Sequence, residues 1–362
     1  MLATLTAHLN RRHDLSAAQV REAVHELTSS AVESVAKADF LIALSTKGES
    51  IAEIAAFVRE LRRMSIVPPI SPALRRGEIL DVCGTGGDKL NTFNISTTVA
   101  LVAASAGVPV AKHGNRAITS KSGSADVLEA LGVATHLSPE AAAFSLERHC
   151  FAFFLASNFH PSFRHIAEAR RICAERGQRT IFNFVGPLLN PAHPTAQLVG
   201  VATPELCTAV AEVLRSSGVR RGMVVSGRAG EGWLDELSPL GESKVVEFYQ
   251  DRAVSESMIS PEDLMLERCN LEDLAGGDSA VNAKLIEAIL AGQDKGPRRT
   301  AVLLNAGAAL FVAGRTKSIQ EGIEMAGGLL DSGATLRKLE ALRQPLQHVT
   351  EVQSEDGSVA PI

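Results

Sequence analysis

The sequence has few cysteines and no paired cysteine motif. Its five cysteines, at positions 83, 150, 173, 207 and 269, are odd in number and include no Cys-x-x-Cys pair. This pattern argues against a disulfide framework and indicates buried thiols in a reducing compartment. We expect Cys83 to pack in the core, because its context is apolar and a nucleophilic role would need an activating base.

Long apolar runs, a secretory leader and a basic surplus are also missing. Met1 to Leu9 is short, contains His8 and has no small-residue cleavage pattern, and no stretch is long enough to span a membrane. The 41 acidic residues outnumber the 36 basic ones, for a formal charge of −5. This balance argues against nucleic acid or an anionic membrane as the main partner. We expect a cytoplasmic protein with neither kind of partner.

Two common nucleotide-binding motifs are absent as well. The glycine turn Gly84-Thr-Gly-Gly-Asp88 follows the apolar run Ile79–Val82, but it fits neither the Gly-Lys-Ser/Thr loop nor the Gly-x-Gly-x-x-Gly fingerprint. The turn still suits phosphate, because Gly84, Gly86 and Gly87 can adopt positive φ and present several amide hydrogens to one anion. A purely structural tight turn is the alternative.

The residues after this turn are typical of a helix start. Asn94, Ser96 and Thr97 are helix-capping types and precede a small apolar helix expected over Thr98–Ala106. The positive end of that helix would face the same ligand as the glycine turn.

A second strand end carries polar groups. The strand expected at Pro109–Ala111 leads into Lys112-His-Gly-Asn-Arg116, and Thr119–Asp126 adds hydroxyls and a glycine before a further helix. In an open parallel sheet, neighbouring strands deliver their carboxyl-end loops to the same edge, where ligands bind. Cations interleaved with hydroxyls favour a polyanion site over the alternative, a solvated basic patch. The cations and the histidine of this segment are Lys112, His113, Arg116 and Lys121.

The chain divides into a helical part and an α/β part. Up to about Leu74 the pattern is only helical, most clearly over Ile51–Met64, and a capping box at Ser16 begins another helix. The prolines of Val67–Pro72 form a semi-rigid connector. We predict a helical domain at 1–74, an α/β domain at 75–345 and a frayed tail at 346–362.

Beyond the connector, strands alternate with helices, which predicts an α/β fold with a mostly parallel sheet covered by helices. A helix is expected over Pro204–Ser217, and the chain is helical over Ala280–Leu342, where Ala301–Val312 is apolar enough to be buried. Asp278 is expected to cap a helix and to bind no ligand. Strands are expected near 79–82, 109–111, 151–156, 198–202, 223–226 and 245–249.

Two adjacent acids could hold a metal. Asp235 and Glu236 stand side by side in the loop Gly232–Pro239. In isolation such a pair is more often a solvated turn. A polyphosphate pocket on the same sheet edge would require magnesium, which prefers carboxylate and phosphate oxygens.

A helix expected over Phe163–Arg171 carries several arginines. One of them could clamp a carboxylate through two parallel hydrogen bonds, and the residues alone do not select which. The nearby histidines, without an acid or cysteine at ligand spacing, are expected to be polar surface residues. The arginines are Arg164, Arg170 and Arg171, and the histidines are His160 and His165.

Together, six separated motifs resemble the anthranilate phosphoribosyltransferase family. The resemblance spans roughly Asn10 to Leu342 and implies a small helical domain hinged to a large α/β domain, with a homodimer formed through the helical domains. It implies transfer of the phosphoribosyl group from 5-phosphoribosyl diphosphate to the amine of anthranilate, which releases pyrophosphate and gives N-(5-phosphoribosyl)anthranilate in tryptophan biosynthesis. The motifs are 81–88, 91–97, 112–116, 120–124, 182–191 and 234–236.

The resemblance also implies roles for residues. Phosphoribosyl diphosphate would be bound by Gly84, Gly87, Asp88, Thr92, Asn94, Ile95, Ser96, Thr97, Lys112 and Ser124. Anthranilate would be bound by Gly84, His113, Asn115 and Arg170, and two magnesium ions by Ser96, Asp235 and Glu236. No dedicated catalytic base is expected, because an anilinic amine is uncharged at neutral pH and needs positioning more than deprotonation.

The chain departs from the family pattern at two points. Lys89-Leu90 stands where a glycine is usual, and Cys173–Gln178 is a few residues longer, which bears on the choice between Arg170 and Arg171. A pyrimidine nucleoside phosphorylase shares the architecture, but its glycine loop carries lysine and serine where this chain has Asp81-Val-Cys. A noncatalytic nucleic-acid-binding relative would show a basic surplus and eroded acids, which this chain does not.

Overall fold

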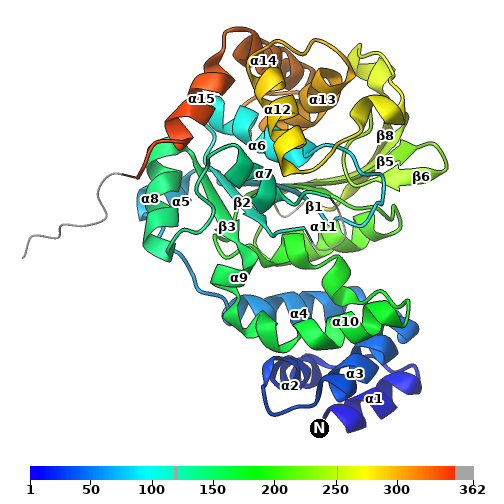
Figure 1. Cartoon of the computed structure of the whole chain (residues 1–362). Coiled ribbons are helices and arrows are strands. Elements are labelled where there is room, and N and C mark those ends of the chain that lie inside the picture. Colours follow the sequence, from blue (N-terminus) through cyan, green and yellow to red (C-terminus); the bar gives the residue numbers. More distant parts are fainter. Residues whose placement is uncertain (118–120, 251, 347–362) are drawn as a thin grey trace, which may run out of the picture.

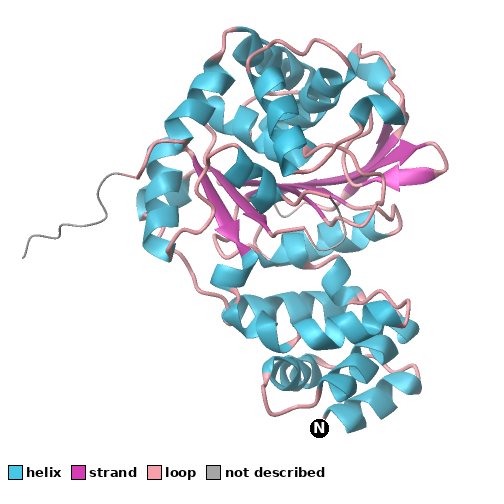
Figure 2. Ribbon diagram, viewed as in Figure 1, coloured by secondary structure: helices cyan, strands magenta, loops and turns pink. Residues whose placement is uncertain are grey.

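The computed structural model describes residues 1–117, 121–250 and 252–346. It consists of a helical part that contains the N-terminus and a larger α/β part (Figure 1). Figure 2 shows one sheet inside the larger part, with helices on both of its faces. The predicted fold class is therefore confirmed. The frayed tail predicted at 346–362 lies outside the described residues except for its first residue.

The helical part begins with α1 (Leu2–Asn10), α2 (Ala17–Thr28), α3 (Ser34–Lys47) and α4 (Ile51–Arg63). Ser16 starts α2 through the predicted capping box, and Ser50 starts α4 in the same way. Helix α4 confirms the helix predicted from its apolar periodicity, and Ile54, Val58 and Leu61 are buried on its inner face. A short helix, α5 (Pro72–Arg76), follows the proline connector.

A segment from the middle of the chain completes the helical part. The 3₁₀ turn η1 (Pro161–His165) packs on α2, and α10 (Ala167–Glu175) packs on α3, beside which it lies in Figure 1. The buried Lys37 joins the two segments, because its Nζ donates to Ser29 O (2.6 Å) and His165 O (2.8 Å). The single helix expected over Phe163–Arg171 is thus two elements, which break near Ile166.

The sheet has the order β3-β2-β1-β4-β5-β7-β8, with β6 paired to β5. Strands β3, β2, β1, β4 and β5 are parallel, and β6, β7 and β8 run antiparallel to their neighbours. The six predicted strands are all present. The sequence did not indicate β6, which lies in a predicted loop, or the solvent-exposed edge strand β8. The bounds are β1 Leu80–Gly84, β2 Val110–Gly114, β3 Phe151–Leu155, β4 Ala196–Gly200, β5 Arg221–Ala229, β6 Gly232–Leu234, β7 Ser243–Tyr249 and β8 Ser255–Ile259.

Helices cover the two faces of the sheet. On one face α6 (Ile95–Ser105) packs on β1 and β2. Three further helices pack on α6: α13 (Pro297–Val312), α14 (Ile319–Asp331) and α15 (Ala334–Leu342). On the other face α11 (Leu206–Ser216) packs on β5 and β7 and contacts α4. The predicted helical C-terminal region is confirmed, and α13 is buried over most of its length. The remaining elements are α7 Ser124–Ala130, α8 Pro139–His149, α9 Ala156–Phe159, η2 Ile181–Asn183, η3 Gly186–Leu189, η4 Pro261–Leu264, η5 Leu271–Leu274 and α12 Ser279–Leu290.

Three of the five cysteines, Cys83, Cys173 and Cys207, are buried as predicted, whereas Cys150 and Cys269 are only partly buried. All five cysteines lie within the described residues, are free of disulfides, and include Cys83 in the core as predicted. Asp278 caps α12 as predicted, because its side chain accepts a hydrogen bond from Val281 N. None of the helices in the described part of the chain is long and apolar enough to cross a membrane.

Candidate active site

The carboxyl ends of β1 and β4 meet beneath Asp235. The strands end at Gly84 and Gly200, which are partners in the sheet register. A Cβ on Gly84 would lie 2.1 Å from Asp235 Oδ2, and one on Gly200 would lie 1.5 Å from Asp235 O. Only glycine at these two strand ends allows the acidic loop to lie directly on the edge of the sheet.

The glycine turn has the predicted backbone conformation at two of its three glycines. Gly86 and Gly87 have φ values of +73° and +82°, in the left-handed region. Gly84 is the last residue of β1 and does not have positive φ. Its predicted conformation was wrong, because what this position requires is the absence of a side chain under Asp235.

The acidic pair joins the glycine turn to the start of α6. Gly86 N donates to Asp235 Oδ2 at 2.7 Å, and Ser96 N donates to Glu236 Oε1 at 3.1 Å. Burial, followed by repulsion from Asp88, raises the pKa of Asp235 to about 7. Burial, followed by repulsion from Asp235, raises the pKa of Glu236 to about 8. Two crowded carboxylates of this kind favour a bound cation.

Helix α6 begins at Ile95, earlier than expected. Asn94 takes the N-cap position, but its side chain makes no capping bond. Instead its Nδ2 donates to Ser122 O (3.2 Å), and its Oδ1 accepts from Asn282 Nδ2 (2.9 Å). Capping by the Asn94 side chain was therefore a wrong expectation, because tertiary partners compete for it. Ile95 and Thr97 are buried, so Ile95 can offer only its backbone to a ligand.

Lys112 lies under the start of α6. The residue is 1% exposed, and its Nζ donates to Val82 O (2.7 Å) and Ser96 Oγ (3.3 Å). Burial lowers the pKa of Lys112, and the neighbouring acids oppose that shift. Lys112 is thus no part of a solvated basic patch, since it is a buried cation aimed at the Ser96 hydroxyl.

Asp81 holds the strand ends together below this cation. It is fully buried, and its carboxylate accepts from Asn190 Nδ2 (2.8 Å) and His113 N (3.3 Å). Burial raises the pKa of Asp81 to about 6. These bonds fix β1 and β2 relative to the segment that follows η3.

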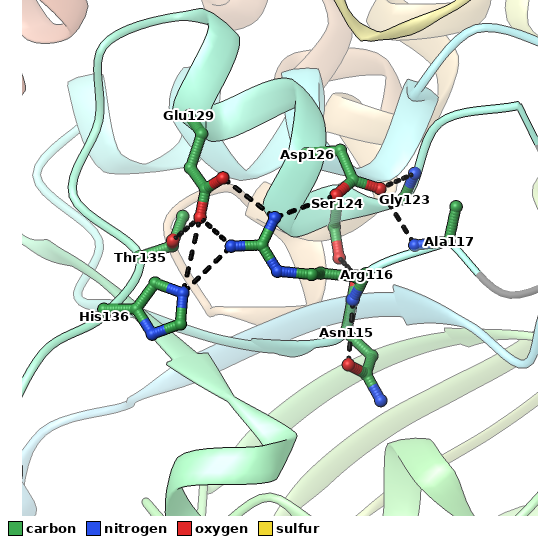
Figure 3. A network of polar contacts seen from close by, with 9 residues as sticks. All are labelled: Asn115, Arg116, Ala117, Gly123, Ser124, Asp126, Glu129, Thr135 and His136. Carbon is green, nitrogen blue, oxygen red and sulfur yellow. Dashed lines mark hydrogen bonds and ion pairs between the residues drawn. The ribbon is translucent and has the colours of Figure 1, made fainter.

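The loop after β2 is braced by the ion-pair network of Figure 3. Arg116 binds Glu129 through both terminal nitrogens (2.9 and 2.6 Å), and its Nη1 also bonds Asp126 (3.2 Å). Asp126 Oδ2 accepts from the backbone nitrogens of Ala117 and Gly123, both at 2.9 Å. Arg116 therefore stabilises the loop after β2, and the carboxylates of Asp126 and Glu129 balance its positive charge. Ser120 of the predicted motif lies outside the described residues.

A cavity opens between these groups and the helical part. It measures about 290 Å³. A neighbouring cavity of about 660 Å³ shares Thr85, Gly86, Arg170 and Phe182 with it, so the two cavities are adjacent. Of the candidate residues, the first cavity is lined by Gly84, Gly86, Ser96, Lys112, His113, Asn115, Ser124 and Arg170, and the second by Gly86, Gly87, Arg116, Arg170 and Arg171. Asp88 bonds within the glycine loop, and Thr92 pairs with Ala275.

The structure separates Arg170 from Arg171. Arg170 lines both cavities and stacks over Phe182, with its Cζ 5.8 Å from the ring centroid. Within the described ranges no carboxylate forms an ion pair with Arg170. Arg171 is exposed and ion-paired to Glu168 and Glu175. Arg170 is thus the guanidinium that is open to a ligand carboxylate.

His113 is a buried histidine in the wall of the first cavity. The side chain is 7% exposed, its Nδ1 lies 3.2 Å from Gly186 O, and its Nε2 is buried without a partner in the described residues. Because a carbonyl only accepts, Nδ1 carries the hydrogen and Nε2 is an acceptor. Burial lowers the pKa of His113 to about 3, so the ring is neutral at physiological pH.

His160 is buried, contrary to the predicted surface position. It is 1% exposed, and its Nε2 bonds Leu189 O at 2.9 Å. No local pattern indicates that Phe163 of η1 stacks on this ring, with the ring centroids 4.8 Å apart. His165, expected at the surface, is half-buried and accepts from Arg164 Nε.

The burial of His160 predicts a pH effect on stability. Burial lowers its pKa to about 4, whereas an unfolded histidine titrates near 6.5. Between pH 4 and 6.5 the histidine is protonated in the unfolded state but neutral in the folded state. Lowering the pH from about 6.5 toward 4 therefore favours unfolding, and the stability contributed by neutral His160 is lost. In urea unfolding at several pH values, His160→Gln should reduce the slope of unfolding free energy with pH by up to about one proton. Exposed His13→Gln is the control, and identical slopes for wild type and His160→Gln would refute the assignment.

Sequence reasoning missed several residues that shape the site. Gly200 could have been recognised as a glycine inside a predicted strand, a sign of close approach by another group. Asn282 bonds both Asn94 and Gly277 N from α12, and nothing local in the sequence marks that contact. Arg179 lies near the glycine turn, with its Nη2 3.2 Å from the position of a Cβ on Gly87.

Gly200→Ala is expected to damage both stability and the site. A methyl group there would overlap the Asp235 carbonyl, so the acidic loop must shift, at a cost of about 1–3 kcal/mol. Gly328→Ala is the matched control, because its added Cβ meets nothing within 4 Å in helix α14. Urea unfolding should show a loss for the first variant only. Equal stability of both variants would contradict the packing described for Asp235.

The donor set at the acidic pair suits magnesium. The described residues hold no group of three or more His, Cys, Asp or Glu that could bind a metal. They do place the Asp235 carboxylate against the glycine turn and the Glu236 carboxylate against the backbone of Ser96 at the start of α6. Magnesium typically takes one or two carboxylates and completes its shell with water and phosphate oxygens. The site therefore fits a cation that is shared with a phosphorylated ligand.

Known families account for most of the chain. Residues 76–336 match the Glycosyl transferase family, a/b domain, and residues 3–65 match the Glycosyl transferase family, helical bundle domain. The fold and the cleft thus define a glycosyl transferase with a helical bundle and an α/β domain.

Similarity to individual proteins identifies the family within this class. The chain is 44% identical to an anthranilate phosphoribosyltransferase of Symbiobacterium thermophilum, over 91% of this chain and 94% of the relative. It is 43% identical to that of Petrotoga mobilis, over 91% of this chain and 92% of the relative. The chain belongs to the anthranilate phosphoribosyltransferase family, which confirms the predicted family and enzyme class over the two alternatives.

Solved structures of this family have the same fold as the chain. The crystal structure of anthranilate phosphoribosyltransferase from Thermus thermophilus matches with a TM-score of 0.84 at 41% identity, over 94% of this chain and 98% of that chain. The Saccharomyces cerevisiae enzyme in complex with PRPP and Mg matches with a TM-score of 0.81 at 27% identity, over 94% of this chain and 97% of that chain.

Proposed function

We propose that the cleft transfers the phosphoribosyl group of 5-phosphoribosyl diphosphate to the amine of anthranilate. The amine nitrogen forms a bond to the ribose C1, and the bond from C1 to the diphosphate oxygen breaks with its electron pair. Pyrophosphate leaves, and the product is N-(5-phosphoribosyl)anthranilate, an intermediate of tryptophan biosynthesis. The amine loses a proton to solvent or to the departing pyrophosphate.

One observation carries this proposal: the acidic pair is hydrogen-bonded to both phosphate-binding elements. Asp235 bonds the glycine turn and Glu236 bonds the start of α6. The turn and the helix start supply amide hydrogens, and the acids supply cation ligands, within one cleft. A diphosphate with its counter-cation is the ligand that needs both.

The residues proposed to hold the donor are those of the turn, the helix start and the loop after β2. Negative charge grows on the diphosphate as the C1–O bond breaks, and fixed donors stabilise that charge without reorganising. Lys112 adds a buried positive charge and orients the Ser96 hydroxyl. The donor-binding residues are Gly84, Gly87, Asp88, Thr92, Asn94, Ile95, Ser96, Thr97, Lys112 and Ser124.

Magnesium is the proposed cofactor, as two ions held by Ser96, Asp235 and Glu236. Bound there, it would neutralise the diphosphate and polarise its leaving oxygen. The crowding of Asp235 and Glu236, which raises the pKa of each, supports a cation at this point.

Anthranilate is proposed to lie in the cavity lined by Gly84, His113, Asn115 and Arg170. Arg170, without an acidic partner in the described residues, would bind the carboxylate. Neutral His113, in the wall of the same cavity, would pack beside the bound anthranilate and help to hold its amine toward C1. This accounts for catalysis by positioning, without a dedicated base.

The remaining proposals concern the whole chain. We propose a homodimer through the helical domain, 1–74, where Val35 and Ile51 are exposed apolar residues, with the α/β domain at 75–345. Five free cysteines support a cytoplasmic location. Size-exclusion chromatography with light scattering should give twice the chain mass of 38.3 kDa.

Phosphorus NMR tests the proposed reaction. The protein, anthranilate, magnesium and phosphoribosyl diphosphate should yield pyrophosphate in step with loss of anthranilate. Omitting anthranilate should leave the donor intact. Pyrophosphate release that is independent of anthranilate would show hydrolysis and contradict the proposal.

A further inference from the structure

A third cavity lies at the junction of the helical and α/β parts. It measures about 490 Å³ and shares no lining residue with the two cavities of the active site. Its walls come from α4, the connector, the loop before β4 and the C-terminal end of α11. The described residues that line it include no acid: they are Ala55, Arg59, Arg62, Arg63, Val67, His193, Ser216 and Ser217.

Arg62 is a buried cation at this cavity without a carboxylate partner. The side chain is 8% exposed, its Nε donates to Leu188 O at 2.6 Å, and its Nη1 donates to Ser217 O at 3.3 Å. Its Nη2 is buried without a hydrogen-bond partner in the described part of the chain. A buried charge of this kind is costly unless an opposite charge accompanies it.

The residues around Arg62 add positive charge. Arg59 and Arg63 both pair with the single carboxylate of Glu60, which Arg21 also contacts. The one carboxylate of Glu60 is therefore shared by several guanidinium groups, and a net positive charge remains at the cavity. Burial, with Arg62 and Arg75 adding to it, lowers the pKa of His193 to about 4, as expected beside such an excess.

A purely structural role explains only part of this arrangement. Arg62 and Arg63 stand in the last turn of α4, where positive charge favours the helix dipole, and Arg62 ties α4 to Leu188 and Ser217 of the α/β domain. Neither role needs an open cavity beside the arginines, and neither satisfies Arg62 Nη2.

We propose that this cavity binds a small phosphate-bearing anion, held by Arg62 together with Arg59 and Arg63. Guanidinium groups arriving from several positions of α4 suit the tetrahedral oxygens of phosphate. The anion would supply the missing counter-charge. It would also bridge α4 and the end of α11, and so link the two domains beside the connector residue Val67.

The position of the cavity relates it to the active site. Arg62 holds Leu188 O, and Gly186 O of the same 3₁₀ turn, η3, holds His113 Nδ1. A bound anion would therefore hold Arg62 against η3, the turn whose Gly186, Pro187 and Leu189 line the first cavity of the active site.

Isothermal titration of the full-length protein with inorganic phosphate, after the active site has been saturated with magnesium and 5-phosphoribosyl diphosphate, tests the site. The wild type is expected to bind phosphate, and the double variant Arg59→Gln/Arg63→Gln to lose roughly tenfold or more in affinity, because charge-assisted hydrogen bonds to the anion are lost. Arg268→Gln/Lys295→Gln, which removes two ion-paired surface cations elsewhere, should stay within about twofold. Glycerol 3-phosphate as a second probe distinguishes a phosphate ester from the free ion as the preferred occupant.

Arg62→Gln should weaken binding further, but it also removes an interdomain tie and can unfold the chain. The double variant Arg59→Gln/Arg63→Gln does not remove that tie, so it keeps the test decisive. Circular dichroism verifies that this variant is folded. Absence of phosphate binding by the wild type, or equal affinity and stoichiometry in wild type and double variant, would overturn the proposal. The titration involves no turnover, so its failure is distinct from failure of the proposed reaction.

Discussion

Glu236→Gln and Asp235→Asn are each expected to lower kcat/KM by roughly 10²–10³-fold, because several kcal/mol of leaving-group stabilisation depends on these charges. The amide oxygens can still accept from Ser96 N and Gly86 N, so the local backbone is retained. The folded state should be as stable as wild type or more stable in the absence of magnesium, since each change removes a crowded, buried negative charge. Initial rates and urea unfolding measure the two effects.

Glu231→Gln is the matched control, because Glu231 is an exposed acid in the turn between β5 and β6. It should leave the rate and the stability unchanged. Loss of rate together with loss of stability in the Glu236 and Asp235 variants would indicate structural damage instead. Unchanged rates would contradict the proposed cation site.

Arg170→Ala is expected to raise the KM for anthranilate by roughly 10²-fold, because a charge-assisted bidentate contact with the carboxylate is lost. The KM for phosphoribosyl diphosphate should change little, since Arg170 stacks on Phe182 and the proposed donor contacts come from other residues. Arg171→Ala is the control, and because Arg171 is exposed and already paired with Glu168 and Glu175, both KM values should be retained. Steady-state kinetics with each substrate varied in turn gives both constants.

Equal weakening for both substrates in Arg170→Ala would argue against a specific carboxylate contact. A larger effect of Arg171→Ala would reverse the assignment. This comparison resolves the ambiguity that the longer segment Cys173–Gln178 left in the sequence.

The fold and the approximate site could be predicted because local patterns carry them. The alternation of apolar strands and helices predicted the parallel sheet, and sheet topology then placed successive strand ends at one edge. Gly86 and Gly87 adopt positive φ as their residue type suggests. The association of the glycine turn, the helix start and the acids followed from this geometry.

What could not be predicted depends on contacts between distant segments. Asn94 looks like a cap in sequence, but it bonds Asn282, 188 positions away. His160 looks like a surface residue, but it is buried and bonds Leu189 O, and Arg116 looks free, but it pairs with Glu129. Gly84 and Gly200 are needed only because Asp235 crosses both strand ends. Contacts of this kind leave no local pattern in a single sequence.

The decay of anthranilate fluorescence tests the central claim most directly. We predict that fluorescence falls only when the protein, phosphoribosyl diphosphate and magnesium are all present, that EDTA stops the decay, and that added magnesium restores it. Decay without the phosphoribosyl donor, or at full rate in EDTA, would contradict the claim that this cleft transfers a phosphoribosyl group with the help of a cation held by Asp235 and Glu236.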